Sequence, residues 1–334
     1  MIRSLDLPVA LVASVVGPVA PLSRLVHRTR AMGGRLEIHV AAPAAEAAVA
    51  EGEMRQVAGR VGAWAAKLTR HDPTSQLMRL NGDPRPRVAV GPTLAAVLRW
   101  ALEAGDLTGG VVDVSLLDAR LGAEHEAATL PRAATRPVSA PSRDDRRWEL
   151  SAGGPRGSCV VTRVPGLRLD LDGVAKGWLA DRALARLRWP GALVDADGDI
   201  AVRAAPGEPW QVGIGDPRDD DVLLGVLTLP GGLLGARAYG VATSGTTVHR
   251  WGPAGDARHH LIDPATGMPS RSDVLQATVV AGTAHEAEAY AKTIVILGAA
   301  AGLDLVERSD ALGAVVLLHN GRTIALPRTS RFLA

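Results

Sequence analysis

The sequence predicts an α+β fold in which strand-rich runs alternate with single long helices. Polar and apolar residues alternate in RLEIHV at 35–40, which is the pattern of a half-buried strand. Apolar residues recur at helical spacing over 91–110, where Pro92 suits the first turn and Gly109 and Gly110 follow the last. Because no clean repeat relates these runs, the pattern favours α+β over a doubly wound α/β sheet.

The elements follow in order along the chain. The alanine-rich stretch 43–68 has the apolar spacing of a helix, whereas the polar segment 123–147 has little periodicity and is expected to be a surface loop. Further predicted helices are 174–188 and 285–298. Predicted strands and hairpins are 148–151, 158–163, 167–171, 192–204, 210–214, 222–229 and 314–325.

The composition is that of a globular protein with an aliphatic core. Of 334 residues, 47% are hydrophobic but only 3% are aromatic. The formal net charge is +2, and no cluster of Lys and Arg contains interleaved aromatic residues, so we expect no nucleic-acid partner. Arginine is the usual cation, because Lys67, Lys176 and Lys292 are the three lysines among 37 basic residues.

The N-terminal run 8–22 is apolar but too short to span a bilayer, so we expect no integral membrane span. Asp6 precedes the run and prolines interrupt it, which favours a cytoplasmic protein. A signal-like segment, and thus a secreted or periplasmic protein, is the open alternative. The predicted organisation is an N-terminal arm at 1–29, one domain at 30–326 and a C-terminal tail at 327–334.

A predicted strand turns into a helix within LDLDGVAKGWLAD at 169–181. A helix N-terminus attracts anions, and Lys176 in the first turn opposes the helix dipole unless an anion such as phosphate lies against it. Asp170 and Asp172 suit a bound cation, a ligand hydroxyl or a helix cap. A capped surface helix with a solvated lysine is the open alternative.

Two further segments carry polar residues in dense spacing. VATSGTT at 241–247 allows close approach to its backbone, and HHLIDPATGMP at 259–269 contains His260 and Asp263 before a turn. A histidine and an aspartate in such a turn are usually structural. Ser244 and His260 do not indicate a serine hydrolase, because no nucleophile-elbow sequence is present.

The helix predicted at 285–298 carries Glu288 and Lys292 at i and i+4, so that they share a face. Thr283 and Glu286 form a capping-box pattern at its start. Two interpretations stay open. The pair is a surface ion pair that contributes about 0.3–0.5 kcal/mol, or the apolar helix directs Glu288 inward.

The chain resembles the ApbE family, the FAD:protein FMN transferases, over about residues 30–325. The resemblance rests on the order of MGGRLEI, SQLMRLN, TGGVVDVS, LDLDGVAKGWLAD, ALVDADGDI, VATSGTT, HHLIDPATGMP and HEAEAYAKTIVILG. It implies a T-fold-like α+β fold of duplicated halves, with mixed or antiparallel sheets, long helices and FAD bound between the halves. It further implies Mg²⁺-dependent transfer of FMN from FAD to a Ser or Thr of an acceptor protein through a phosphoester, with release of AMP.

The resemblance also implies site residues. Its flavin-binding positions match Met32, Val111, Val112, Asp113, Asp170, Lys176 and Ile262. Its H-x-I-D-P motif contains His260 and Asp263, which are the catalytic candidates because phosphoryl transfer to a hydroxyl needs a proton acceptor. Its metal positions match Gly173, Glu288 and Lys292.

The chain departs from the family pattern at the metal. The family has Asp where this chain has Glu288, and Thr where it has Lys292, and a protonated lysine is no ligand. Either Mg²⁺ binds through Glu288 and backbone oxygens while Lys292 contacts phosphate, or the Lys292 ammonium replaces much of the metal's charge. The altered motif also leaves two other functions open, a Mg²⁺-dependent FAD pyrophosphatase that yields FMN and AMP, and a non-catalytic FAD-binding protein.

Overall fold

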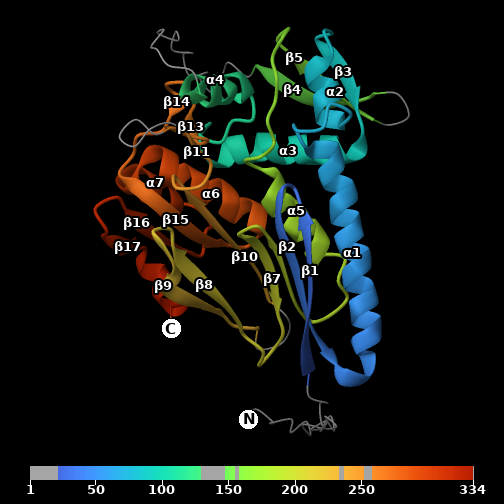
Figure 1. The fold of residues 1–334 in the computed structure, drawn as a ribbon, viewed down its shortest axis with the longest axis vertical. Helices are drawn as coiled ribbons and strands as arrows, with labels where there is room; N and C mark the ends of the chain where they lie inside the picture. Colours follow the sequence, from blue (N-terminus) through green and yellow to red (C-terminus); the bar gives the residue numbers. More distant parts are fainter. Residues whose placement is uncertain (1–21, 129–146, 155–157, 233–236, 252–257, 334) are drawn as a thin grey trace, which may run out of the picture.

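The computed structural model describes residues 22–128, 147–154, 158–232, 237–251 and 258–333. An eight-stranded antiparallel sheet forms its centre (Figure 1). Its strands lie in the order β1 (Leu22–Ala31), β2 (Gly34–Pro43), β6 (Gly191–Ala196), β7 (Asp199–Ala204), β10 (Arg237–Gly245), β15 (Val274–Ala281), β16 (Gly313–Leu318) and β17 (Thr323–Ala325). The α+β class and the antiparallel pairing are thereby confirmed, while the division into two similar halves stays a prediction.

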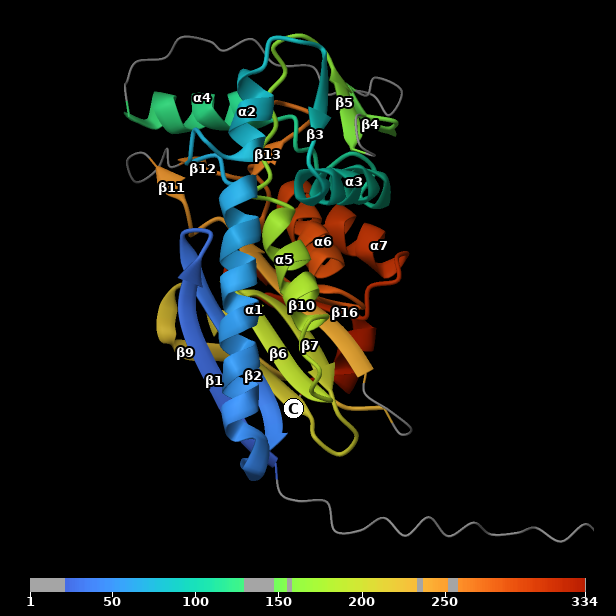
Figure 2. The ribbon, with the colours of Figure 1, turned by 90° about the vertical axis from the view of Figure 1, so that its right-hand side faces the viewer.

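Both faces of this sheet are covered. Helices lie against one face, and Figure 2 shows them in front of the strands: α1 (Ala47–Leu68), α5 (Ala175–Leu184), α6 (Ala284–Leu297) and α7 (Ala299–Glu307). The hairpin of β8 (Trp210–Asp216) and β9 (Asp219–Leu229) covers the other face. Neighbouring residues alternate between the two layers, because Val194 packs in a core cluster with α1 and α5 residues and Leu193 packs with the hairpin.

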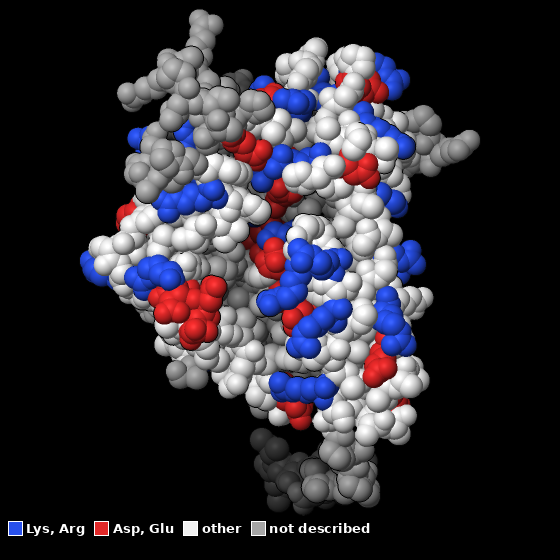
Figure 3. Space-filling view, viewed as in Figure 1, with Lys and Arg blue, Asp and Glu red and all other residues white. Residues whose placement is uncertain are grey.

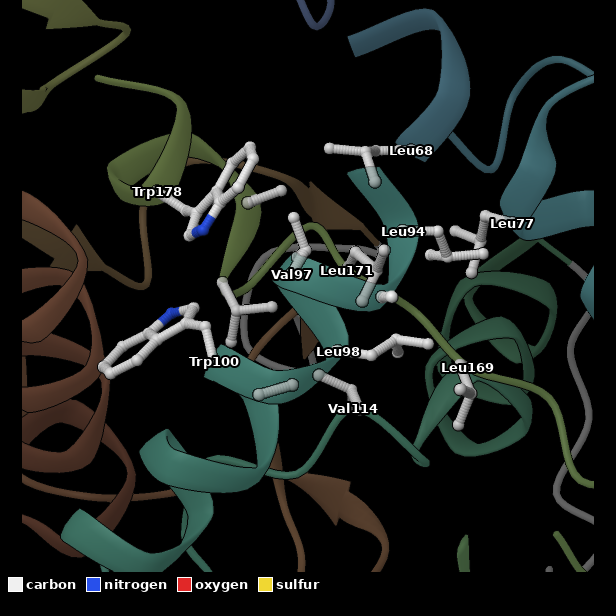
Figure 4. Close-up of a cluster of buried hydrophobic side chains, with 14 of the residues drawn as sticks. Leu68, Leu77, Leu94, Val97, Leu98, Trp100, Val114, Leu169, Leu171 and Trp178 are labelled. Carbon is white, nitrogen blue, oxygen red and sulfur yellow. The ribbon is translucent and has the colours of Figure 1, made fainter. Parts of the chain in front are cut away.

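A smaller part lies at one end of the sheet, at the top of Figure 1. It consists of β3 (Arg87–Val90), β5 (Cys159–Arg163), β4 (Trp148–Ala152), α2 (Gln76–Gly82), α3 (Pro92–Leu107) and α4 (Leu117–Ala128). Figure 4 shows Leu94 and Leu98 of α3 in the same core cluster as Leu169 and Leu171, which precede α5. This core therefore fixes the segment that leads into α5.

Four short strands complete the structure near α4 and α6. They are β11 (Arg250–Trp251), β12 (Arg258–His259), β13 (Ile262–Asp263) and β14 (Met268–Pro269). β11 pairs with β12, and β13 pairs with β14. No helix in the described residues is long and apolar enough to cross a membrane.

Helices α5 and α6 make a close contact at Gly177. A Cβ at Gly177 would lie 2.7 Å from the Ala284 carbonyl oxygen and from the His285 Cα, so glycine is required for this approach. The Asp181 carboxylate of α5 accepts hydrogen bonds from the backbone N–H groups of Ala284 (3.1 Å) and His285 (3.0 Å). The N–H of Gly177 in turn donates to Glu288 Oε2 at 3.0 Å. Each helix thus supplies a carboxylate that accepts hydrogen bonds from backbone N–H groups of the other.

Two predicted segments differ in the structure. Residues 167–171 form no strand, because the backbone of Leu169 bonds instead to the side-chain amide of Asn81, at 2.8 Å in both directions. The predicted loop at 123–147 begins inside α4, which continues to Ala128, and 129–146 lie outside the described residues.

Ordered elements extend beyond both ends of the segment 30–326, and the predicted division into arm, domain and tail stays a prediction. Strand β1 begins at Leu22 and pairs with β2 from that residue on, although the arm was expected to end at 29. Residues 1–21 lie outside the described part. At the other end, residues expected to form a tail contain a 3₁₀ helix (Pro327–Arg331), and Phe332 is buried, with its carbonyl accepting from the N–H of Thr228 at 2.7 Å. An apolar side chain anchors this end to the hairpin layer.

The Gly177 contact yields the first prediction. Gly177→Ala should lower the free energy of unfolding by about 1–3 kcal/mol, because the methyl group forces backbone atoms of α5 and α6 apart. Urea unfolding followed by circular dichroism measures this change. Gly62→Ala is the matched control, since Gly62 lies in α1 with open space at its Cβ and should be neutral or stabilising by about 1 kcal/mol. Equal stability of the Gly177 variant and wild type would contradict the close approach.

Candidate functional site

A pocket that is partly open to solvent joins segments that are far apart in the sequence. Figure 3 shows a hollow on this face of the molecule with acidic and basic side chains along it. The pocket is lined by Val111, Val112, Asp113, Val114, Leu116, Arg120, Asp170, Asp172, Gly173, Val174, His260, Leu261, Ile262, Lys292 and Ile296. Apolar walls with a few charged groups are typical of a site for a small organic ligand.

The loop after α3 forms one wall. It contains Val111–Asp113, which were predicted to bind flavin, and the structure brings all three to the pocket. The Asp113 carboxylate accepts from the N–H of Ser115 (2.8 Å) and from its hydroxyl (2.9 Å), which holds the loop in place. The Val114 carbonyl accepts from the N–H of Asp170 at 2.8 Å, so this wall is joined directly to the segment before α5.

Asp170 and Asp172 share one arginine. The Arg120 guanidinium from α4 lies 2.7 Å from Asp170 Oδ2 and 2.8 Å from Asp172 Oδ2. Burial, together with the neighbouring Asp172, raises the pKa of Asp170, and Arg120 opposes this. Burial also acts on Asp172, but Arg120 and Arg70 outweigh it and lower the pKa of that carboxyl. Both carboxylates are therefore occupied by an ion pair on the pocket wall.

Lys176 contacts acidic and backbone groups within the protein, and its predicted contact with flavin stays a prediction. Its Nζ lies 3.2 Å from Asp199 Oδ2 and 3.4 Å from the Asp197 carbonyl oxygen. The charge of Asp199 raises the pKa of Lys176, while burial raises the pKa of Asp199 against the effect of the lysine. Lys176 is thus neither a solvated cap residue nor part of the pocket lining, and its ammonium is engaged beside the pocket.

Glu288 points into the protein, as one of the two interpretations of this helix expected. Its side chain is 1% exposed, and Lys292 Nζ lies 2.9 Å from its Oε1. Its other oxygen, Oε2, accepts from Gly177 N–H. The Lys292 stem runs past Gly173, where a Cβ would lie 3.2 Å from Lys292 Cε. Glycine at 173 therefore leaves room for the lysine to reach the pocket.

The side chains at the predicted metal position do not fit Mg²⁺ as ligands. This ion takes six oxygen ligands at about 2.0–2.1 Å, but both oxygens of Glu288 already have hydrogen-bond donors. The Lys292 ammonium, at 2.9 Å from Oε1, occupies the space that a metal on that oxygen needs. Across the described ranges, no three His, Cys, Asp or Glu residues gather as metal ligands.

His260 lies in the pocket as a neutral base. Burial, followed by the charges of Lys292 and Arg120, lowers its pKa to about 3. Its Nδ1 is buried and has no hydrogen-bond partner in the described structure. The His249 ring packs nearly perpendicular to it, with centroids 5.2 Å apart. The imidazole is therefore held unprotonated at the pocket, with one buried ring nitrogen that makes no hydrogen bond in the described structure.

The other predicted residues have separate places. Ile262 of β13 lines the pocket. The Asp263 carboxylate accepts from the N–H of Ala265 at 2.9 Å and so stabilises its own turn, away from the pocket lining. Met32 lies in the β1–β2 turn with a positive φ of 54° and packs against the core rather than the pocket. Its turn is close to that of Asp197, whose Oδ1 accepts from the N–H of Arg35 at 3.2 Å.

Three residues at the site were not predicted. Arg120 has no local signal, because a single arginine on an irregular helix resembles any surface arginine. His249 lies where VATSGTT ends, without a pattern of its own. Asp199 stands within ALVDADGDI, where the sequence predicts an Asp-Gly turn but indicates no partner for this aspartate. All three become visible only when distant segments are brought together.

Comparison with known proteins agrees with this architecture. The profile of the ApbE family matches residues 32–316. The FAD:protein FMN transferase of Treponema pallidum (strain Nichols) is 29% identical over 257 residues, which cover 71% of this chain and 69% of that protein. The enzyme of the same name from Escherichia coli (strain K12) is 26% identical over 80% of this chain and 77% of its own length.

Solved structures show the same fold. The flavin transferase ApbE from Vibrio cholerae is 22% identical with a TM-score of 0.70, and the match covers 94% of this chain and all of that chain. The ApbE protein of Thermotoga maritima is 23% identical with a TM-score of 0.72, over 93% of this chain and all of that chain.

The burial of His260 yields a pH prediction. The unfolded chain takes up a proton on this histidine below about pH 6.5, whereas the folded chain keeps it neutral down to about 3. Stability should therefore fall as pH decreases through this window. His260→Gln should lose less of its melting temperature between pH 7 and pH 4 than wild type, as measured by calorimetry. His319→Gln, an exposed histidine, should follow the wild-type profile, and identical profiles of wild type and His260→Gln would contradict the buried neutral state.

Proposed function

The chain belongs to the ApbE family, and from this premise we propose that it transfers FMN from FAD to a Ser or Thr hydroxyl of an acceptor protein and releases AMP. The observation that carries the proposal is the pocket itself. Its apolar walls suit a flavin, and Lys292 suits a phosphate. The neutral His260 can act as the proton acceptor. The names of the relatives, FAD:protein FMN transferase, support the same reaction.

The proposed reaction is a phosphoryl substitution without redox change. The acceptor hydroxyl oxygen attacks the phosphorus that carries the riboflavin side of FAD, and a new P–O bond forms. The bond from that phosphorus to the bridging oxygen breaks, and AMP leaves with this oxygen. The proton of the hydroxyl goes to a base. Such a step depends mainly on charge neutralisation and alignment.

His260 is the proposed base. Its neutral state allows it to accept the proton, and its Nδ1 has no competing partner in the described structure. Lys292 and Arg120 are among the causes of its low pKa. A pyrophosphate bound beside these cations offsets their charge, so the imidazole becomes a stronger base when substrate is present. Histidine basicity is thereby coupled to substrate binding.

The remaining residues have proposed roles in binding and positioning. The apolar side chains of Val111, Val112 and Ile262 suit the ring systems of FAD. Asp170, with Arg120, holds the shape of the wall, and Asp263 positions His260 through the turn that it stabilises. The proposal assigns no role to Mg²⁺, because both carboxylate oxygens of Glu288 already accept hydrogen bonds within the protein.

The transfer is tested directly with purified flavin-acceptor domains. Incubation with FAD should give an acceptor whose mass is increased by one FMN moiety, with AMP in equal amount, as measured by intact-protein mass spectrometry and chromatography. An acceptor domain whose target Ser or Thr is replaced by Ala should stay unmodified. Free FMN that appears faster than any labelling, with no acceptor needed, would instead identify a FAD pyrophosphatase. Bound FAD that stays intact would contradict both activities.

The role of His260 gives a separate prediction. His260→Gln should lower the rate of acceptor labelling by about 10²–10⁴-fold, the usual effect of removing a general base. FAD affinity should change little, because the glutamine keeps a polar group at the wall. Single-turnover labelling and flavin fluorescence titration measure the two quantities. Parallel losses of rate and affinity would show that His260 only binds substrate.

A further inference from the structure

The Glu288–Lys292 pair places a fixed positive charge at the pocket. Lys292 is 12% exposed at its side chain, so its ammonium is largely withdrawn from water. Glu288, at 1% exposure, anchors it at 2.9 Å. The three N–H groups of a lysine radiate from one nitrogen, and within the described residues Lys292 donates to Glu288. Its other donors are therefore available on the side that lines the pocket.

A second ion pair lies behind the first. Lys176 and Asp199 are 3.2 Å apart, and Asp199 is 3% exposed. We call Lys176, Asp199, Glu288 and Lys292 the charged cluster. Its members interact, since the charges of Glu288 and Lys292 both act on Asp199 and that of Glu288 acts on Lys176. Two lysines thus lie beside two acidic side chains, so the protein itself supplies the counter-charges of the cluster.

A divalent cation would disturb this balance. It would have to displace the Lys292 ammonium from Glu288 Oε1, and the displaced charge would remain close by in a poorly solvated site. Removing the lysine has the opposite consequence. Glu288 would then lose the cation that contacts it, which is unfavourable for a buried carboxylate and favours the entry of another cation. The same position therefore excludes Mg²⁺ with lysine and attracts it with a small neutral residue.

We infer that the Lys292 ammonium replaces the divalent cation at this site, so that the chain binds the FAD pyrophosphate without Mg²⁺. This inference rests on the proposed function, because FAD is the anion concerned. Gly173 lies against the end of the lysine stem, where a Cβ would be 3.2 Å from Lys292 Cε. Glu288 is a positioning residue that directs the ammonium and uses both its oxygens within the protein.

The test is a titration of FAD, followed by flavin fluorescence, in excess EDTA and in excess Mg²⁺. Wild type should give the same Kd in both within about twofold. Lys292→Thr should bind FAD about tenfold or more weakly in EDTA, the scale expected for a lost charge-assisted contact, and should recover on addition of Mg²⁺. Lys67→Thr, at a lysine in α1 outside the cluster, is the matched control and should behave as wild type.

A second readout needs no substrate. Mg²⁺ alone should raise the melting temperature of Lys292→Thr and leave that of wild type unchanged, because only the variant has an unpaired buried carboxylate. The double variant Glu288→Gln/Lys292→Met removes both charges together. It should fold without the pair, bind FAD weakly and show no response to Mg²⁺.

The outcomes separate the inference from the proposed function. FAD binding by wild type that requires Mg²⁺ would overturn the inference and leave the transferase proposal in place. Tight, metal-independent FAD binding by the double variant would overturn the role of Lys292. Failure of wild type to bind FAD under either condition would overturn the proposed function itself.

Discussion

The close approach of α5 to α6 at Gly177 is the constraint on which the rest of the site depends. A side chain at this position would meet backbone atoms of Ala284 and His285, so the two helices meet there only because glycine has no Cβ. Asp181 ties the start of α6 to α5, and the Gly177 N–H reaches Glu288 Oε2. The position of an interior carboxylate is thus determined by the backbone of a neighbouring helix.

The buried charges follow from this contact. A carboxylate as enclosed as Glu288 needs a cation, and a lysine one turn later on the same helix supplies it without changing the backbone. Asp199, at the start of strand β7, and Lys176, in the first turn of α5, form a second ion pair of this kind. On the opposite wall Arg120 serves two aspartates. Ion pairs made within the protein therefore lie in and beside the pocket walls, while the apolar lining comes from the loop after α3, from Val174, from Leu261 and Ile262, and from Ile296.

The sequence predicted most of the architecture and part of the site, and the limits have physical causes. Periodicity located α1, α3 and α6 because local spacing reports which face is buried. Periodicity predicted a strand at 167–171 that does not form. Polar and apolar residues do alternate there, but the side chain of the distant Asn81 makes the hydrogen bonds to the backbone of Leu169. Periodicity left Glu288 undecided, since an i, i+4 pair has the same spacing on a surface and in an interior. Arg120 was missed because its partners lie on another segment.

The order of strands in the central sheet has a consequence for biosynthesis. Strands β15, β16 and β17 lie at one end of the sheet, and α6 and α7 follow β15, so this end of the sheet and two of the helices that cover it come from the last part of the chain. A nascent chain that ends before α6 presents an uncovered sheet face and lacks Lys292 altogether. Substrate cannot stabilise such a chain, because a ligand favours only the state that binds it. The apolar sheet surface that α6 and α7 cover in the finished protein is thus exposed until these helices emerge, and such exposed surface promotes aggregation.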